Sequence, residues 1–282
     1  MVEQVALYAT IQDLGRSGVG HLGVSPSGAF DRPALRHANA LVGNHDGAAG
    51  IECLRGGLTV RATRDHRIAV AGAVSAITLD GRPVEHGRMH FVRAGSTFAI
   101  STPTHGLRNY VAVAGGIAGE HTLGSQATDS LSGLGTPALQ SGDELRVGQT
   151  EGPGVEVDVP WAPQLGAVDV NVVLGPRDDH FTPASLDRFL QEEWTVSGQC
   201  DRIGIRLNGP ALERTHGAEV PSEPCVCGSV QITPDGTPIV FGPDHPVTGG
   251  YPVLAVVVDG HTDRLAQVSP GDRIRFARAP LR

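Results

Sequence analysis

The segment that decides the fold is RIAVAGAVSAITLDGRPVEHGRMHFVRAGSTFAI, which runs from Arg67 to Ile100. Short runs of Val, Ile, Leu and Phe alternate in it with turns built on Gly, Asp and Pro. Apolar, β-branched runs between such turns are typical of strands. The segment therefore predicts a succession of short β-strands, as in β-sandwiches and β-barrels.

The same texture continues on both sides of this segment, and the 38 Gly and 20 Pro of the 282 residues agree with many turns. Strands are predicted at Arg67–Ala71, Ala76–Leu79, His90–Val92, Thr97–Ile100, Tyr110–Val113, Val168–Leu174, Ile239–Phe241 and Val253–Val258. The sequence thus favours a mainly β protein.

Two helices interrupt the strands. The first is predicted to begin at the N-cap Asp31, with Pro33 in its first turn, and to stop at Gly43. The second is predicted from the cap Thr182 to about Gln191. Both follow the usual start and stop signals of helices.

A weak internal repeat divides the chain. SGDELRV at residues 141–147 resembles SPGDRIRF at residues 269–276, and each reads as a Gly-Asp turn feeding a closing strand. Residues 151–166 are rich in Pro and Gly, as linkers are. We therefore predict two β domains, over residues 1–155 and 156–282.

The charge composition excludes several functions. The net charge is −8, which argues against general nucleic-acid binding. All 22 basic residues are Arg, so the chain has no lysine for a Schiff base, a P-loop or a biotin attachment. Anions must be held by Arg, by backbone N–H groups or by a partner chain.

The N-terminal sequence MVEQVALYAT lacks the basic and apolar regions of a signal peptide, and no apolar stretch approaches the length of a membrane span. The four cysteines show no framework spacing. We expect a reduced, cytoplasmic protein.

Several motifs do not support the function that they first suggest. Gly18, Gly20 and Gly23 spell GxGxxG, but the helix signal at Asp31 comes too late for a dinucleotide site. His86 with His90, and Cys225 with Cys227, have no third ligand nearby, so no metal site is predicted. GxSxG and HExxH motifs are absent from the sequence.

Three later segments are better candidates for a site. GPRDDH at residues 175–180 is either a solvated turn or part of a site. DRIGIRL at residues 201–207 is either a half-exposed strand with surface ion pairs or part of a site. TGGYP at residues 248–252 is either a tight turn or a nest of backbone N–H groups flanked by the hydroxyls of Thr248 and Tyr251.

Together these segments resemble one family, in the same order along nearly the whole chain. The matching stretches are residues 12–43, 175–183, 197–207, 221–223, 228–236, 248–252 and 265–272. They resemble the family of 5-oxoprolinase C-type subunits, also labelled allophanate hydrolase subunit 2 and biotin-dependent carboxyltransferase subdomains A and B. The family includes an antagonist of a histidine-kinase inhibitor.

The resemblance implies two cyclophilin-like β-barrel domains. It also implies a B-type chain of related fold and an A-type chain, which join the C-type chain in the ATP-dependent opening of 5-oxoproline to glutamate. ATP with Mg is thus expected at the level of the complex, with no covalent cofactor on this chain. In urea carboxylase, the equivalent module transfers a carboxylate from biotin to urea. The shared fold does not choose between these activities.

The sequence departs from the family pattern at Val247, where a second Thr is common, and at Val253, where a Lys is frequent. Cys225 and Cys227 also replace the more usual neighbours of the Ser-Glu motif. A mechanism that needs a lysine from this chain is therefore disfavoured, the carboxyltransferase reaction most of all.

The leading hypothesis is a component of an ATP-hydrolysing 5-oxoprolinase that is inactive alone. A carboxyltransferase component that works with a biotinylated partner is one alternative, and a regulatory protein that antagonises a histidine-kinase inhibitor is another. The candidate catalytic residues are Asp31, Asp178, Glu223 and Tyr251. The candidate substrate-binding residues are Arg16, Arg177, Arg202, Gln231, Thr248, Gly249 and Gly250.

We expect an arginine to pair with a substrate carboxylate or a phosphate, and the turn at residues 248–251 to donate hydrogen bonds around the reacting carbonyl. The carboxylates Asp31, Asp178 and Glu223 are candidates for acid–base chemistry or for orienting Mg²⁺.

Overall fold

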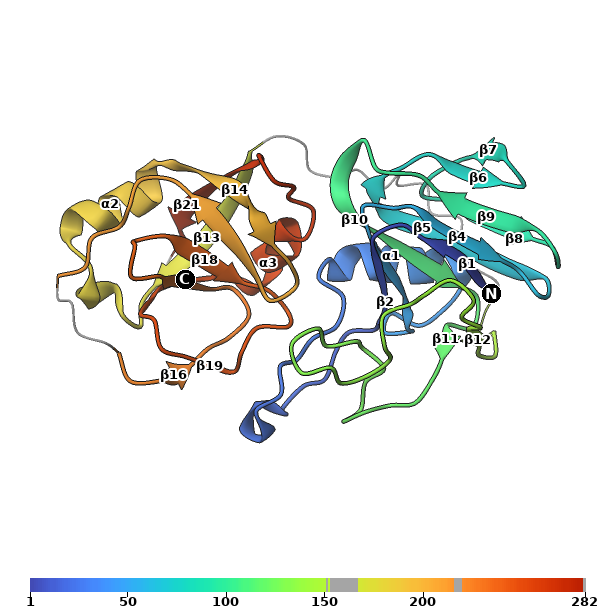
Figure 1. Ribbon diagram of the computed structural model, residues 1–282, viewed down its shortest axis with the longest axis horizontal. Helices are drawn as coiled ribbons and strands as arrows, with labels where there is room; N and C mark the ends of the chain where they lie inside the picture. The colour runs from blue at the N-terminus through green and yellow to red at the C-terminus, as the bar shows by residue number, and fades with distance from the viewer. Residues whose placement is uncertain (151, 153–166, 216–219, 281–282) are drawn as a thin grey trace. The chain divides into compact units, whose positions relative to one another are not determined.

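The computed structural model describes residues 1–150, 152, 167–215 and 220–280. In this part of the chain the protein is mainly β, with three short α-helices (Figure 1). The helices are α1 (Arg32–Val42), α2 (Pro183–Gln191) and α3 (Asp259–Leu265). The predicted fold class is confirmed, and none of the described helices is long and apolar enough to cross a membrane.

The chain divides into two units that are each discontinuous in sequence. The N-terminal unit holds residues 1–16, 27–129 and 133–163, and the C-terminal unit holds residues 17–26, 130–132 and 164–282. The predicted boundary at residue 155 and nearly all of the predicted linker lie outside the described residues.

The N-terminal unit contains two five-stranded sheets, with strand orders β1-β4-β9-β6-β7 and β2-β3-β10-β5-β8. The strands are β1 (Val2–Val5), β2 (Tyr8–Gln12), β3 (Gly50–Leu54), β4 (Leu58–Arg61), β5 (His66–Val74), β6 (Ile77–Leu79), β7 (Arg82–Val84), β8 (Met89–Val92), β9 (Thr97–Ile100) and β10 (His105–Val113). A short pair, β11 (Ile117–Ala118) and β12 (Arg146–Val147), completes the unit.

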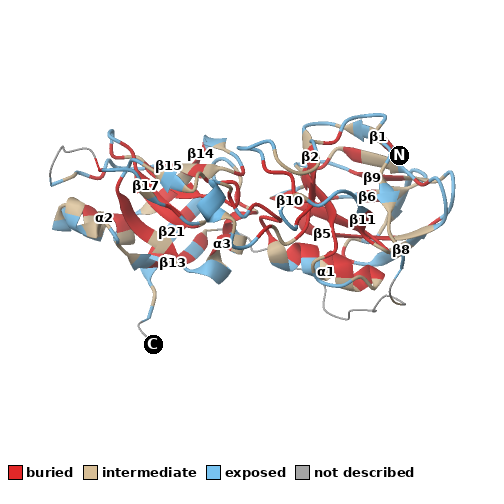
Figure 2. Cartoon of the chain, turned by 90° about the horizontal axis from the view of Figure 1, so that it is seen from below, coloured by how far each residue is buried: buried red, intermediate tan, exposed pale blue. Residues whose placement is uncertain are grey.

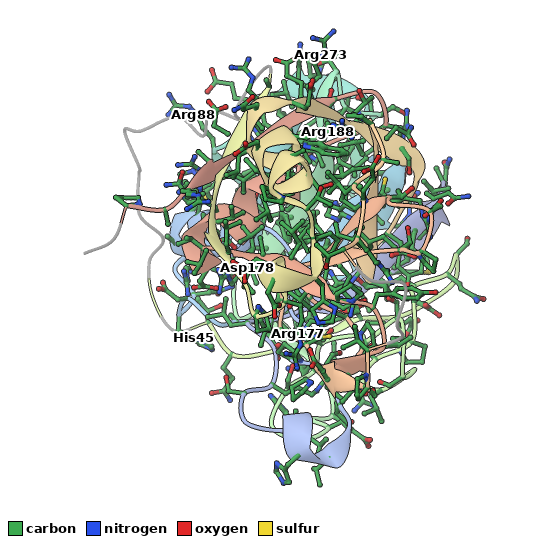
Figure 3. All side chains as sticks on the ribbon, turned by 90° about the vertical axis from the view of Figure 1, so that its left-hand side faces the viewer. His45, Arg88, Arg177, Asp178, Arg188 and Arg273 are labelled. Carbon is green, nitrogen blue, oxygen red and sulfur yellow. The ribbon has the colours of Figure 1, made fainter. Side chains whose placement is uncertain are left out.

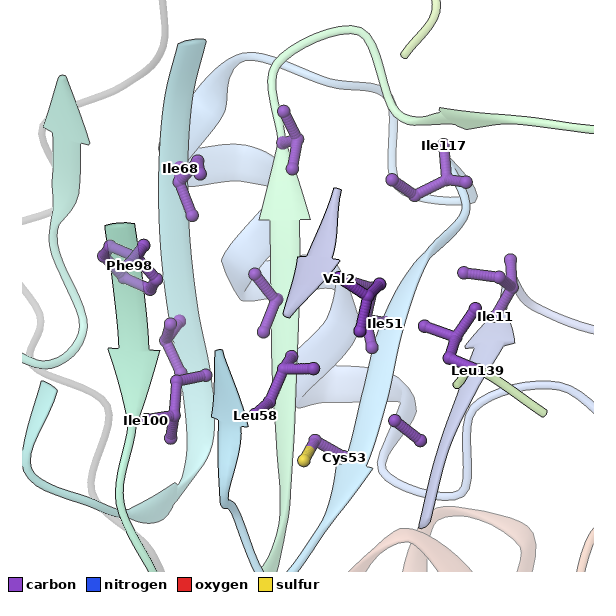
Figure 4. Close-up of a cluster of buried hydrophobic side chains, with 14 of the residues drawn as sticks. Val2, Ile11, Ile51, Cys53, Leu58, Ile68, Phe98, Ile100, Ile117 and Leu139 are labelled. Carbon is purple, nitrogen blue, oxygen red and sulfur yellow. The ribbon is translucent and has the colours of Figure 1, made fainter. Parts of the chain in front are cut away.

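The core of this unit is built from alternate residues of both sheets (Figure 4). Ile51 and Ile68 come from one sheet, Leu58 and Phe98 from the other, and each is at most 3% exposed. The strand period of two places such residues on one face of each sheet.

The opposite face of the β2-β3-β10-β5-β8 sheet is covered by α1. Leu35 and Ala38 of the helix belong to the same buried cluster as Ala69 and Tyr110 of the strands. Small alanines on both surfaces let the helix approach the sheet closely. Its predicted limits are confirmed, since Asp31 is the N-cap and Gly43 is the C-cap, with a φ of 81°.

The C-terminal unit contains a closed barrel with strand order β13-β20-β17-β18-β15-β14-β21. Its strands are β13 (Val168–Leu174), β14 (Glu193–Cys200), β15 (Gly204–Asn208), β17 (Ser229–Ile232), β18 (Pro238–Phe241), β20 (Val253–Val257) and β21 (Arg273–Arg278). Closure pairs β13 in parallel with β21, and it leaves no edge strand in the barrel.

Buried residues, red in Figure 2, lie on the inner strands and helix faces of each unit. In the barrel, Phe189 of α2 stacks on Phe276 of β21, with ring centroids 4.5 Å apart. The indole Nε1 of Trp194 donates to the Phe189 carbonyl at 3.1 Å, so the largest buried side chain is also satisfied. These contacts fix α2 against the barrel.

Candidate functional site

Three of the motifs singled out in the sequence meet in the C-terminal unit. The two-residue strand β16 (Glu223–Pro224) pairs with β19 (Thr248–Gly249), and Glu223 lies opposite Gly249. Just after β13, the backbone N–H of Arg177 donates to the Val253 carbonyl at 2.9 Å. The GPRDDH segment, the Ser-Glu motif and the TGGYP turn are thereby brought together.

We call this cluster the turn site. Its residues are Arg177, Glu223, Gln231, Thr248, Gly249, Gly250 and Tyr251. Asp178, which follows Arg177 in the 3₁₀-helix η2 (Asp178–His180), flanks it. Figure 3 labels Arg177 and Asp178 among the side chains of the described residues.

An ion pair is the main electrostatic feature of the turn site. The Nε of Arg177 donates to Oε1 of Glu223 at 2.7 Å, and its Nη2 donates to the same oxygen. These hydrogen bonds, helped by the Arg177 charge, hold the pKa of Glu223 below its usual value, and His180 acts in the same direction. Glu223 is therefore a carboxylate at neutral pH, which makes it a hydrogen-bond acceptor and excludes it as a general acid there.

A buried amide holds the turn in place. Gln231, on β17, is 4% exposed, and its Nε2 donates to the Tyr251 carbonyl at 2.9 Å and to the Cys225 thiol at 3.5 Å. A Cβ at Gly249 would stand 2.3 Å from that Nε2 and 3.1 Å from the Cys225 sulfur. Only glycine lets the strand approach Gln231 this closely.

The remaining residues of the turn face solvent. Tyr251 is 42% exposed, and Thr248 and Gly250 are also exposed. Their hydroxyl and backbone donors are accessible to a ligand. The hydrogen-bonding role predicted for this turn is compatible with that exposure and stays a prediction.

Arg202 lies outside the turn site, in a buried ion pair. It is 4% exposed, and its Nε and Nη2 donate to the two carboxylate oxygens of Asp244 at 2.8 and 2.9 Å. The half-exposed strand predicted here is present as β15, where buried and partly exposed residues alternate from Gly204 to Asn208. Arg202 precedes this strand, and its ion pair is buried and not on the surface.

Ser130 completes this buried pair. Its backbone N–H and its hydroxyl donate to Oδ2 of Asp244 at 2.9 and 2.7 Å. Burial acts to raise the pKa of Asp244, but the Arg202 charge and these hydrogen bonds hold it below the usual value. Neighbouring residues Asp201, Arg206 and Phe241 line an open groove of about 490 Å³.

Arg16 and Asp31 belong to the N-terminal unit. Arg16 is 2% exposed and donates to the carbonyls of Ala127, at 2.5 Å, and Thr122, at 3.3 Å. The carboxylate of Asp31, which is 3% exposed, accepts from the Ala34 N–H at 3.0 Å. Both residues thus have structural partners, and their catalytic or binding roles stay predictions.

Sequence reasoning missed three contributors. His180 helps to lower the pKa of Glu223, the Cys225 thiol accepts a hydrogen bond from Gln231, and Asp244 forms an ion pair with Arg202. His180 belongs to the GPRDDH segment, Cys225 lies two residues after Glu223, and Asp244 lies four residues before Thr248, but spacing alone does not link any of them to its partner. The signal that could have pointed to these residues was the number of Arg residues close to carboxylates for which no partner had been predicted.

Comparisons with known proteins identify relatives of the chain along nearly its whole length. The family model described as the carboxyltransferase domain, subdomain A and B, matches residues 22–278. The chain is 36% identical to the C subunit of the 5-oxoprolinase of Escherichia coli (strain K12), over 99% of this chain and 90% of that protein. It is 32% identical to the urea amidolyase of Saccharomyces cerevisiae, over 95% of this chain but 16% of that protein.

Solved structures share the fold. The crystal structure of TTHA0988 matches with a TM-score of 0.89 and 33% identity, over 98% of this chain and 55% of that one. The Kluyveromyces lactis urea carboxylase matches with a TM-score of 0.90 and 26% identity, over 99% of this chain and 27% of that one. The chain therefore spans about half, or less, of the length of these structures.

Proposed function

This chain belongs to the carboxyltransferase domain family, subdomain A and B, and from that premise we propose that it is the C-type subunit of an ATP-dependent 5-oxoprolinase. The complex would open the lactam of 5-oxoproline to glutamate. The observation that carries the proposal is the 36% identity to the C subunit of a 5-oxoprolinase over 90% of that protein's length. A second such protein, from Haemophilus influenzae, is 34% identical over 89% of its length.

The turn site supports the proposal chemically. An amide substrate needs hydrogen-bond donors near its carbonyl oxygen and an acceptor near its N–H. Thr248, Gly250 and Tyr251 supply exposed donors, and Glu223 supplies an ionised acceptor. Among the three candidate arginines, Arg177 alone has a substantially exposed side chain, at 39%.

The partners and ATP belong to the complex. We propose that ATP with Mg²⁺ acts at that level, where A-type and B-type chains join this one. Hydrolysis of ATP would supply free energy to drive the opening of this stable amide. The described residues of this chain hold no group of three or more His, Cys, Asp and Glu that could bind a metal ion.

The test is co-expression of this chain with the A-type and B-type chains, followed by an assay of glutamate released from 5-oxoproline. We expect release that needs ATP and all three chains, and none from this chain alone. A folded three-chain complex that releases no glutamate would contradict the proposal.

A carboxyltransferase role is the second candidate, since urea amidolyases and a urea carboxylase share the domain. The complete absence of lysine and the Val at position 253 weigh against it. Carbon from labelled bicarbonate in the product, together with inhibition by avidin, would favour that role over lactam opening.

A further inference from the structure

The Arg177–Glu223 pair leaves one carboxylate oxygen available. Both guanidinium donors, Nε and Nη2, converge on Oε1 of Glu223. Oε2 accepts no hydrogen bond from the described residues, and the Glu223 side chain is 17% exposed. An ionised oxygen that is fixed by its neighbour and reachable from solvent is a prepared acceptor for a donor on a ligand.

The pairing of β16 with β19 sets the direction in which this acceptor lies. Residues directly opposite in an antiparallel pair share a face, as do residues two apart in a strand. Glu223 and the vacant Cβ direction of Gly249 therefore share one face of the pair, and that direction points at the Gln231 amide. The Gln231 Nε2 is already used by Tyr251 and Cys225, so this amide adds no free donor there.

The local charge argues against an anion in the same place. Arg177 is neutralised by Glu223, and Asp178 and Asp179 follow it directly in the chain. A carboxylate or phosphate brought to Arg177 would meet a cation already paired with Glu223 and would approach three acidic side chains. A neutral amide would instead donate its N–H to Glu223 and accept from an exposed guanidinium or turn donor.

We propose that Glu223 is a specificity-determining residue of the turn site: its Oε2 accepts the N–H of a neutral amide substrate, and Arg177 positions it. This inference rests on the proposed function and assigns to this site the lactam end of 5-oxoproline, away from the substrate carboxylate. It fits urea equally well, because urea also presents N–H groups beside a carbonyl.

The test compares ligands that carry the N–H with analogues that lack it. Binding of 5-oxoproline and of its lactone analogue, in which the ring oxygen replaces N–H, is measured by calorimetry on the full chain and on its co-expressed complex. Urea and tetramethylurea form a second pair. We expect the wild type to prefer the N–H member of a pair at least about tenfold, since a hydrogen bond to a charged group is lost in the other.

Glu223→Gln should reduce that preference to about twofold or less. The side-chain oxygen of the new glutamine would accept from Arg177, and the negative charge that attracts the ligand N–H would be gone. Glu223→Asp keeps the charge with a shorter reach, and its thermal melt shows whether the fold survives changes here. Glu193→Gln is the matched control: Glu193 also pairs with arginines in the same unit, at Arg273 and Arg275, and should keep the full preference.

An unchanged preference in Glu223→Gln overturns the inference, and so does a wild type that binds none of the N–H probes at millimolar concentration. If the wild-type complex turns over 5-oxoproline while Glu223→Gln keeps the preference, only this inference fails. If the preference for N–H is found with urea but no glutamate is released from 5-oxoproline, only the proposed function fails.

Discussion

At the scale of single residues, Gly249 shows how closely the turn site is packed. We predict that Gly249→Ala destabilises the protein by about 1–3 kcal/mol, because the new methyl group overlaps the Gln231 amide and crowds Cys225. Displacement of Gln231 should also release the Tyr251 carbonyl and weaken binding of 5-oxoproline to the complex. Urea unfolding and calorimetry measure the two effects.

Gly250 provides the control for this change. A Cβ at Gly250 meets no atom within 4 Å, and its backbone φ is not in the left-handed region. Gly250→Ala should therefore leave the free energy of unfolding nearly unchanged. Equal losses in the two alanine variants would mean that general backbone stiffness, and not contact with Gln231, makes glycine necessary here.

A second residue-scale prediction concerns the buried Arg202–Asp244 pair. Arg202→Ala should cost about 3–5 kcal/mol of stability, since it leaves the fully buried Asp244 carboxylate without a cation to pair with. Removing both charges, by Arg202→Met with Asp244→Leu, should recover much of that loss. Arg273→Ala, at an exposed pair, should hardly move the melting temperature. A double variant as unstable as Arg202→Ala would refute the stranded-charge explanation.

At the scale of secondary-structure elements, the start of α1 allows the structural and the catalytic role of Asp31 to be tested separately. Asp31 caps the helix through Ala34, and Asp31→Ala should cost about 1 kcal/mol of stability. Asn caps helices about as well as Asp, so Asp31→Asn should keep the stability while removing the carboxylate. Chemical denaturation measures the stability of both variants.

The activity of Asp31→Asn then decides the predicted catalytic role. Full glutamate release by a complex that carries this stable variant would reduce Asp31 to a helix cap. A large loss of turnover, with unchanged stability, would establish that the charge itself is needed. The two outcomes cannot be confused, because the folding measurement is made on the same variant.

At the scale of the whole molecule, we expect the protonation of Asp244 to account for part of the loss of folding stability at acidic pH. Its folded-state pKa is depressed by Arg202 and Ser130 in spite of burial. A depressed carboxyl pKa stabilises the fold above the unfolded value, near 3.8, and this contribution is lost as the pH falls through the folded value. The melting-temperature gap between wild type and Asp244→Asn should be constant from about pH 7 to 5 and shrink below about pH 4. A constant gap down to pH 3 would contradict this.

Much of the fold could be predicted because it follows local rules. The apolar runs between turns in Arg67–Ile100 identified strands, and the caps at Asp31, Gly43 and Thr182 fixed both predicted helices. Helix α3 was not predicted, since Asp259–Leu265 is short and lacks a side-chain cap. Closure of the barrel through β13 and β21 also escaped the sequence, because strand order depends on contacts about a hundred residues apart.

The site was predicted only in its parts. The TGGYP, GPRDDH and Ser-Glu motifs were each recognised, and the structure brings them together. The pairing of Arg177 with Glu223, and of Arg202 with Asp244, could not be read from spacing. The partners are more than forty residues apart in each case, and one pair is half exposed while the other is buried. Such differences arise from tertiary packing, which a local pattern does not encode.

The hydrogen bonds from Ser130 to Asp244 have a consequence for recombination between the genes of related proteins. Ser130 lies far upstream of the barrel strands, yet it belongs to the C-terminal unit with residues 17–26. A chimera made by a single crossover near the middle of the gene would therefore take the barrel, with Asp244, from one parent. It would take Ser130, which donates hydrogen bonds to the buried Asp244 carboxylate, from the other parent. Chimeras of this family should tolerate exchange of the halves only when the residues at 130 and 244 remain compatible.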